Sequence, residues 1–205
     1  MAEQTLVSLL SEAGWTMGPL YACSVVALAA TVRKALQFRE RGVDRRSALE
    51  LEVDPDALPA LAEKLEQDAS PVGRVMAATA RALVERPARA EQVATRVATA
   101  ELDAAEEGMT LLAFIAQVAP LFGLLGTVLG MVDLFSGMEA AGANVETSTL
   151  SSGIWKALLT TAVGLIVAIP TLGVHAWFGR RITRLQLALE EGAGRLLDAA
   201  LGDAR

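Results

Sequence analysis

The 205-residue chain has very few of the side chains on which enzymes and metal sites usually depend. It holds one cysteine, Cys23, and one histidine, His175. A single cysteine excludes an internal disulfide and a cysteine-based metal site, so we expect Cys23 to be a small core residue. The sequence also has no glycine-rich phosphate loop and no Gly-x-Ser-x-Gly nucleophile turn. We therefore expect neither a metal nor a cofactor, and a membrane enzyme is poorly supported.

Clusters of basic residues interleaved with aromatic residues are also missing. The formal net charge is -6, and only 4% of the residues are aromatic. A nucleic-acid-binding protein needs a basic surface, so we expect no nucleic-acid partner. Hydrophobic residues make up 53% of the chain and charged residues 20%. This hydrophobic share exceeds that of a usual soluble domain, which indicates a chain partly in a membrane and partly in water.

Three long runs of the sequence lack Asp, Glu, Lys and Arg, and they contain 20, 25 and 23 residues. Each run is long enough to cross a hydrocarbon layer of about 30 Å as a helix. The first is interpreted as a mature helix and not as a signal peptide, because Glu3 and Glu12 precede it and no basic residue does. We predict an all-α membrane protein that forms a single domain. Its three transmembrane helices are predicted at about residues 13–32, 108–135 and 156–179.

The basic residues predict how the chain crosses the membrane. Of 18 Lys and Arg residues, 12 lie between Arg33 and Arg96 and five follow from Arg180 onward, which leaves only Lys156 elsewhere. By the positive-inside rule, the stretches after the first and third spans are cytoplasmic, with the N-terminus outside and the C-terminus inside. The predicted cytoplasmic helical region comprises residues 33–107 and 180–205, and the predicted external loop comprises residues 136–155.

Helix-forming residues dominate the predicted cytoplasmic region, and prolines mark its breaks. Asp54-Pro55 and Ser70-Pro71 each place a capping residue before a proline suited to the first helical turn. From Pro87 onward no breaker precedes the second span, so we predict one long helix that enters the membrane without a stop. The third span is predicted to continue as a helix to Leu201.

The second and third spans carry small and hydroxyl-bearing residues among their aliphatic ones. Small residues let helices approach closely, and a hydroxyl in hydrocarbon needs a partner. Thr127, Thr160 and Thr161 could bond a neighbouring helix or hold water beside a carboxylate, or each could bond back to its own helix. The pattern leaves both interpretations open. The residues expected to permit close helix packing are Pro120, Gly123, Gly126, Gly130, Gly164 and Pro170.

Ionisable residues are absent from the middle of the second and third spans. A proton-driven machine needs such a group within the membrane, so another chain would have to supply it. Asp133, at the outer side, is interpreted as a solvated carboxylate. Lys156 either ends its helix as an interfacial residue, which we favour, or pairs with Asp133 and narrows ion entry. His175 is interpreted as an interfacial residue, with a proton relay as the alternative.

Two motifs carry a resemblance to a known family. One is Ala-Pro-Leu-Phe-Gly-Leu-Leu-Gly-Thr-Val-Leu-Gly-Met at 119–131, followed by Phe135, and the other is Ala-Leu-Leu-Thr-Thr-Ala-Val-Gly-Leu-Ile-Val-Ala-Ile-Pro at 157–170. In this order they resemble the second-span and third-span signatures of the ExbB/TolQ/MotA proton-channel family. The short chain favours its ExbB/TolQ branch. The first span and the cytoplasmic helices match that branch in layout only.

This resemblance implies a pentameric homo-oligomer in the bacterial inner membrane. The ring would surround the membrane helices of an ExbD/TolR-like single-span partner whose aspartate carries the proton, with Thr127 and Thr161 on its inner face. It would drive transport or envelope work through a TonB-like or TolA-like protein, and lipid would fill the pore without the partner. Lys156 stands where ExbB proteins often have a glutamate, so TonB, Tol, gliding and import systems stay open. The alternative function is a non-conducting membrane scaffold that clusters partner proteins.

Overall fold

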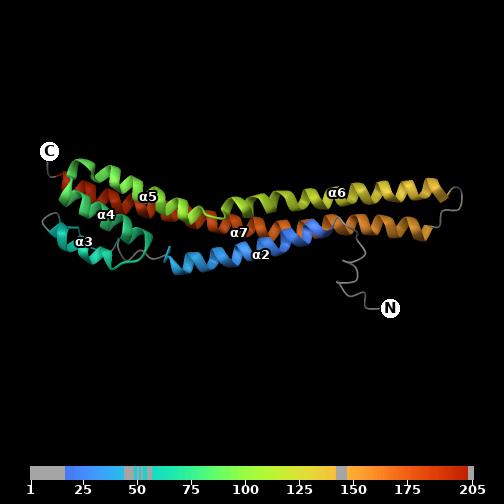
Figure 1. The fold of residues 1–205 in the computed structure, drawn as a ribbon, viewed down its shortest axis with the longest axis horizontal. Helices are drawn as coiled ribbons and strands as arrows, with labels where there is room; N and C mark the ends of the chain where they lie inside the picture. Colours follow the sequence, from blue (N-terminus) through green and yellow to red (C-terminus); the bar gives the residue numbers. More distant parts are fainter. Residues whose placement is uncertain are drawn as a thin grey trace. The chain divides into compact units, whose positions relative to one another are not determined.

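The computed structural model describes residues 17–43, 49, 51, 53–54, 57–141 and 147–202. These residues form helices and no strand, and three of the helices are long and apolar enough to cross a membrane. The predicted fold class, an all-α protein with three transmembrane helices, is thus confirmed. The helices are α2 (Met17–Glu40), α3 (Leu58–Glu66), α4 (Pro71–Glu85), the short 3-10 helix η3 (Pro87–Arg89), α5 (Ala90–Glu106), α6 (Met109–Ala141) and α7 (Thr147–Gly202) (Figure 1).

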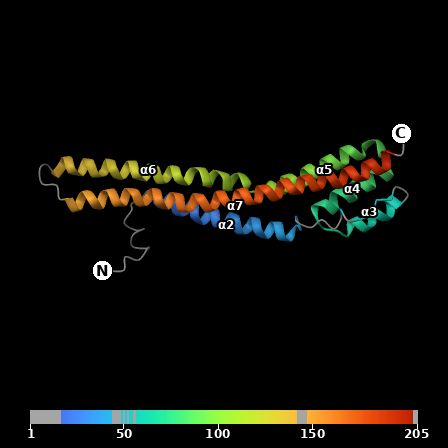
Figure 2. The ribbon, with the colours of Figure 1, turned by 180° about the vertical axis from the view of Figure 1, so that it is seen from behind.

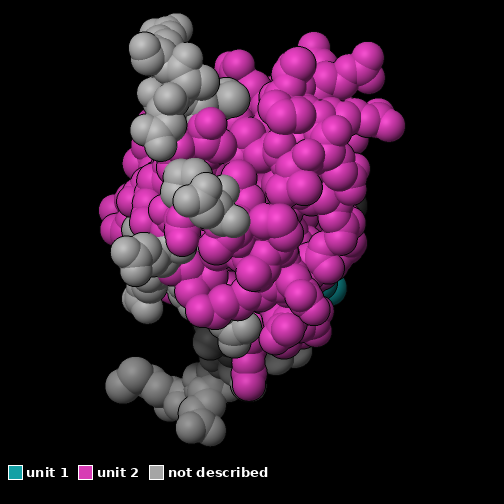
Figure 3. All heavy atoms as spheres, turned by 90° about the vertical axis from the view of Figure 1, so that its left-hand side faces the viewer, with its two compact units in different colours: residues 1–32, 110–175 teal, residues 33–109, 176–205 magenta. Residues whose placement is uncertain are grey.

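The chain divides into two compact units, which Figure 3 colours separately. Unit 1 comprises residues 1–32 and 110–175, and unit 2 comprises residues 33–109 and 176–205. The sequence predicts a single domain. Unit 2 contains almost the same residues as the predicted cytoplasmic helical region, 33–107 and 180–205, because the uncharged runs of the sequence end near those boundaries.

Two predicted boundaries differ from the structure. The prediction of a loop at 136–155 was wrong for residues 136–141 and 147–155, because α6 continues to Ala141 and α7 begins at Thr147. Residues 142–146 of the predicted loop lie outside the described residues. A lone glycine such as Gly137 costs a helix only about 1 kcal/mol, which the good helix formers after it offset. The predicted uninterrupted helix from Pro87 is also wrong: α5 ends at Glu106, and Gly108 adopts φ +82°. Glycine takes that left-handed conformation without steric cost, so it ends the helix there.

Other local predictions can be compared directly. Ser70 caps α4, since its hydroxyl accepts a hydrogen bond of 3.0 Å from the backbone N–H of Gly73. The helical continuation of the third span is confirmed, because α7 runs without interruption to Gly202. Residues 13–16 of the predicted first span and Pro55 lie outside the described residues.

Unit 2 is held together mainly by buried apolar side chains. Leu65 of α3, Met76 of α4 and Leu196 of α7 are completely buried. Phe38 and Phe178 stack edge to face with ring centroids 4.9 Å apart. Within this unit α5 and α7 run side by side in both views (Figures 1 and 2).

One two-pronged ion pair joins α4 to α5 in unit 2. Arg74 donates from Nε and Nη2 to the two carboxylate oxygens of Glu101, at 2.7 and 2.6 Å. This hydrogen bonding raises the pKa of Arg74 above its usual value. Planar pairs of this kind fix orientation as well as adding energy, so the α4–α5 hairpin has a defined register.

Candidate functional site

Helices α6 and α7 of unit 1 approach each other along a row of glycines. A Cβ added to Gly123 would lie 3.0 Å from the backbone oxygen of Thr160, and one added to Gly126 would lie 2.7 Å from the Thr160 hydroxyl. At Gly164 an added Cβ would lie 2.7 Å from the backbone oxygen of Ala119. A Cβ added to Gly130 would lie 3.2 Å from the methyl group of Ala157. Any larger residue would therefore push the helices apart, which is how small residues act in membrane helix pairs.

Three hydroxyl groups gather where the glycines bring the helices together, and we call Thr127, Thr160 and Thr161 the threonine cluster. The Oγ1 atoms of Thr127 and Thr161 lie 2.5 Å apart, so α6 and α7 share a direct hydroxyl-to-hydroxyl hydrogen bond. The Thr161 hydroxyl also reaches the backbone oxygen of Gly123 at 3.0 Å, and the Thr127 hydroxyl reaches that of Ala157 at 3.1 Å. All three contacts cross from one helix to the other, and the two hydroxyl protons can serve two of them at a time.

Thr160 occupies the inner position of the cluster. Its side chain is buried, and its hydroxyl lies 2.7 Å from the Ala157 oxygen of its own helix and 3.2 Å from the Gly123 oxygen of α6. Thr127 likewise reaches its own Gly123 oxygen, at 3.3 Å. Hydrogen bonds across the two helices and bonds back to the own helix therefore occur together in the cluster. Thr171, by contrast, bonds only back to the Val167 oxygen, at 2.7 Å, among the interactions of the described residues.

The hydrogen-bond inventory determines what the cluster can offer a further group. Each threonine hydroxyl has one proton and two lone pairs. Backbone oxygens and the neighbouring hydroxyl are in place to accept all three protons. Lone pairs remain on Thr127 and Thr161, whose side chains are only partly buried. The cluster is thus preorganised to accept a hydrogen bond, which a water or a protonated carboxylic acid can donate.

The other charged residues and prolines predicted for the site make no hydrogen bond to this cluster among the described residues. Asp133 is exposed and Lys156 is partly buried, and in the described part of the chain no ion pair joins them. Pro120 lies inside α6, partly buried, and Pro170 lies inside α7, exposed. His175 is partly buried near the end of unit 1.

Sequence reasoning missed the role of Lys34, which it counted only as a charge that sets orientation. Lys34 is 2% exposed. Its ammonium group donates to the backbone oxygens of Ala105 and Glu107, the latter at 2.6 Å, and to Gln37 Oε1 at 3.2 Å. Carbonyls at a helix C-terminus have no partner within the helix, so this lysine caps α5 where the chain breaks at Gly108. The Gly108 break, with glutamates before it, was the available sequence signal.

Comparison with known proteins adds a family to this geometry. The model of the MotA/TolQ/ExbB proton channel family matches residues 67–191. A segment of 86 residues, 40% of this chain and 38% of the relative, is 36% identical to the biopolymer transport protein exbB1 of Vibrio cholerae. A putative ExbB homolog of Methanothermobacter thermautotrophicus is 32% identical over 62% of this chain and 44% of its own length.

A third relative is a TolQ protein, which the family description also names. The Tol-Pal system protein TolQ of Haemophilus influenzae is 34% identical over 48% of this chain and 41% of its own length. The chain thus spans less than half the length of each of these three relatives. The residues matched by the family model include α4, α5, α6 and the part of α7 up to residue 191, so they contain the whole threonine cluster. The chain therefore belongs to the MotA/TolQ/ExbB proton channel family.

Proposed function

We propose that this chain is a ring-forming subunit of a proton-driven motor in the bacterial inner membrane. The ring surrounds the membrane helices of an ExbD/TolR-like single-span partner, and proton flow through the complex powers transport or envelope work through a TonB-like or TolA-like protein. Family membership supports a proton channel, and the names of the relatives support work on biopolymer transport. The observation that carries the proposal is the threonine cluster, which lies within two spans whose middle parts contain no acidic residue.

The distribution of ionisable groups requires a partner. No Asp, Glu, Lys, Arg or His occurs from Gly108 to Val132 or from Ala157 to Val174. A proton crossing hydrocarbon needs a titratable group within it. An aspartate on a partner helix that stands against Thr127 and Thr161 fills this role.

The hydrogen-bond inventory of the threonine cluster gives the partner's acid a preferred state. A protonated carboxylic acid donates directly to the free lone pairs of Thr127 or Thr161. A carboxylate requires a donor instead, so one hydroxyl must turn its proton away from a backbone oxygen such as that of Gly123. The cluster therefore favours the neutral acid inside the ring, and losing its proton weakens the contact. This difference couples proton release to movement of the partner helix.

The surface of unit 1 supports assembly into a ring. Leu121 and Leu124 of α6 and Ile166 and Ile169 of α7 are all more than half exposed. Such side chains are stable against lipid or against neighbouring copies. We propose five copies around the partner, with lipid in the pore when the partner is absent.

Proton flux in reconstituted vesicles tests this function. Vesicles hold the chain alone, the chain with its single-span partner, or the chain with a partner whose membrane aspartate is replaced by asparagine. We expect flux under an imposed potential only with the unaltered partner, and a complex mass that corresponds to five copies. Equal background flux in all three preparations, with the complex intact, would instead support the non-conducting scaffold.

A further inference from the structure

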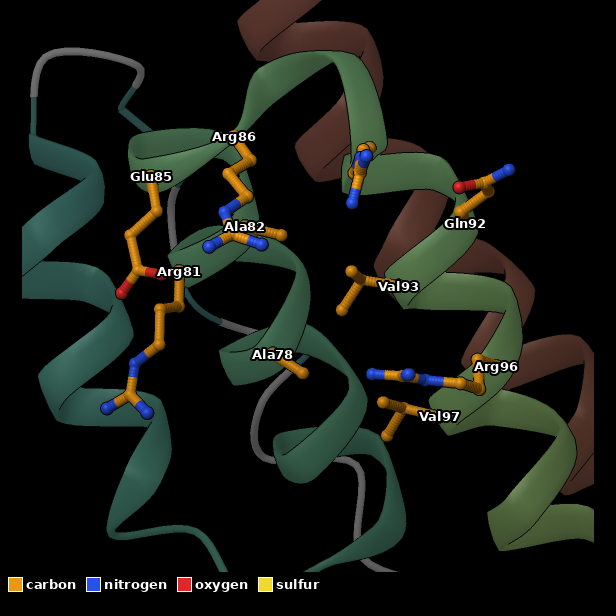
Figure 4. Close-up of a pocket in the computed structure, with 10 residues that line it drawn as sticks. Ala78, Arg81, Ala82, Glu85, Arg86, Gln92, Val93, Arg96 and Val97 are labelled. Atoms are coloured by element: carbon orange, nitrogen blue, oxygen red, sulfur yellow. The ribbon is translucent and has the colours of Figure 1, made fainter.

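A groove opens on the surface of unit 2 between α4 and α5 (Figure 4). The groove has a volume of about 610 Å³. Small apolar side chains form its floor, Ala78 and Ala82 from α4 and Val93 and Val97 from α5. Arg96 extends from α5 toward α4 in Figure 4, and Arg86 stands at the end of α4. With Arg89, these residues form what we call the arginine groove.

The groove carries more positive than negative charge, because one acid, Glu85, lines it together with four arginines. Arg81 at the edge pairs with Glu66. Arg86, Arg89 and Arg96 are exposed, and no ion pair to them exists among the described residues. Three unpaired guanidinium groups above an apolar floor fit an occupant that has both carboxylates and an apolar side chain.

Helix α7 of the same chain carries the complementary surface, and we call Leu187, Glu190 and Glu191 the acidic strip. All three are exposed, Leu187 by 60%. Their spacing of three and four residues places them on one face of the helix. That face points away from the chain's own core, because Leu185, Leu189 and Gly192 are buried on the other side.

The groove and the strip both belong to unit 2, so every copy of the chain carries one of each. Two different and complementary patches on one chain are what a heterologous contact between neighbours in a closed ring requires.

We infer that the arginine groove of one copy receives α7 of the neighbouring copy. Leu187 fills the apolar floor, while Glu190 and Glu191 pair with Arg96 and Arg89. The contact deepens the proposed function, on whose ring it rests, because it ties the helix that carries Thr160 and Thr161 in one subunit to the α4–α5 hairpin of the next. Movement of the partner in one subunit is thereby transmitted to its neighbour.

Cross-linking between two differently tagged forms of the full chain in membranes tests the contact. Both forms carry Cys23→Ser, one carries Arg96→Cys, and the other carries Glu190→Cys. We expect oxidation to give a disulfide-linked pair that contains both tags. The matched control replaces Glu190→Cys with Glu63→Cys, an exposed acid on α3, and should give at least about fivefold less product because Glu63 is not part of the strip.

Charge exchange provides the second measurement. Arg96→Glu should reduce the cross-link between Arg89→Cys and Glu191→Cys by about fivefold or more, and adding Glu190→Arg on the other form should restore it to within about twofold. An intact five-copy complex without the cross-link or the rescue would overturn the contact and leave the proposed function standing. A chain that is monomeric in membranes with its partner present would overturn both.

Discussion

The two units of this chain are held together by different physics. In unit 1 helices α6 and α7 approach closely at glycines, as at Gly164 and Ala119, with hydroxyls bonded across the helices. In unit 2 large buried side chains, such as Met76 and Phe178, form the core and are supported by caps and an ion pair. Lipid is as apolar as leucine, so burying leucine inside a membrane gains little, whereas in water it supplies most of the stability. The same chain therefore joins α6 to α7 through small residues in unit 1 and builds the core of unit 2 from large buried side chains.

Gly164→Leu should be the most disruptive single change. Its first side-chain atom would meet the Ala119 oxygen at 2.7 Å, and a backbone oxygen cannot move aside as a flexible side chain can. We expect α6 and α7 to separate at a cost of about 4 kcal/mol or more, with loss of the assembled complex on size exclusion in detergent. Gly173→Leu is the matched control on the same helix, because nothing lies within 4 Å of a Cβ there. Equal losses in both variants would contradict the packing account.

Met76→Ala should be the most harmful change in unit 2. Met76 is completely buried, and its side chain contacts Gly192 of α7, so truncation leaves a cavity. We expect a loss of about 3 kcal/mol, seen as faster hydrogen exchange in α3, α4 and α5. Leu28→Ala in unit 1 serves as the comparison, since Leu28 is 68% exposed and its truncation should leave exchange in the purified complex nearly unchanged. A larger effect at Leu28 than at Met76 would reverse the comparison of the two units.

Lys34→Met should have a smaller but measurable effect. It removes the donor to the oxygens of Ala105 and Glu107 while keeping a side chain of similar length. Buried carbonyls left without a donor cost about 2 kcal/mol in total. The expected result is faster proteolysis near Gly108, because the end of α5 frays. Arg39→Met, an exposed change on the same helix, should cleave at the parent rate.

The sequence predicted features that depend on the composition of a continuous stretch of chain and missed features that depend on single contacts. The three spans and the continuous α7 follow from charge-free runs and from helix-forming residues, both of which can be seen in the stretch itself. The predictions of an uninterrupted helix through Gly108 and of a loop at 136–141 were wrong. Both judged a glycine by the residues around it in the sequence, whereas the backbone angles of a glycine depend on the fold. The burial of Lys34 could not be predicted, since its partners lie 71 and 73 residues away.

The candidate site was predictable as a set of residues but not as a geometry. Thr127, Thr160 and Thr161 stand out as hydroxyls in hydrocarbon, and the family signature includes them. Spacing alone could not show that Thr127 and Thr161 bond to each other, because that depends on the rotation of two helices about their axes. The arginine groove was also missed, since its members look evenly spread along the chain until α4 folds back on α5.

Glu101→Gln should give the smallest effect that is still specific. Glu101 has a side chain 15% exposed and pairs with Arg74 through two hydrogen bonds. Removing its charge should lower the free energy of unfolding by about 1 kcal/mol in thermal denaturation of the complex. Glu66→Gln is the control, because Glu66 and Arg81 are both exposed and such pairs contribute little. Equal shifts in the two variants would contradict the view that partial burial makes the Arg74 pair effective.

Thr161→Val tests the central claim most directly, when proton flux and assembly are measured on the same preparation with the partner present. Valine keeps the shape but removes the hydroxyl that bonds Thr127 and the Gly123 oxygen. Thr171→Val is the control, because that hydroxyl bonds only back to Val167 among the described residues. The account predicts an intact five-copy complex in both, with flux reduced about tenfold or more in Thr161→Val alone, which is a barrier change of about 1.4 kcal/mol. Parent-level flux in Thr161→Val would contradict the claim that the threonine cluster serves the partner's acid.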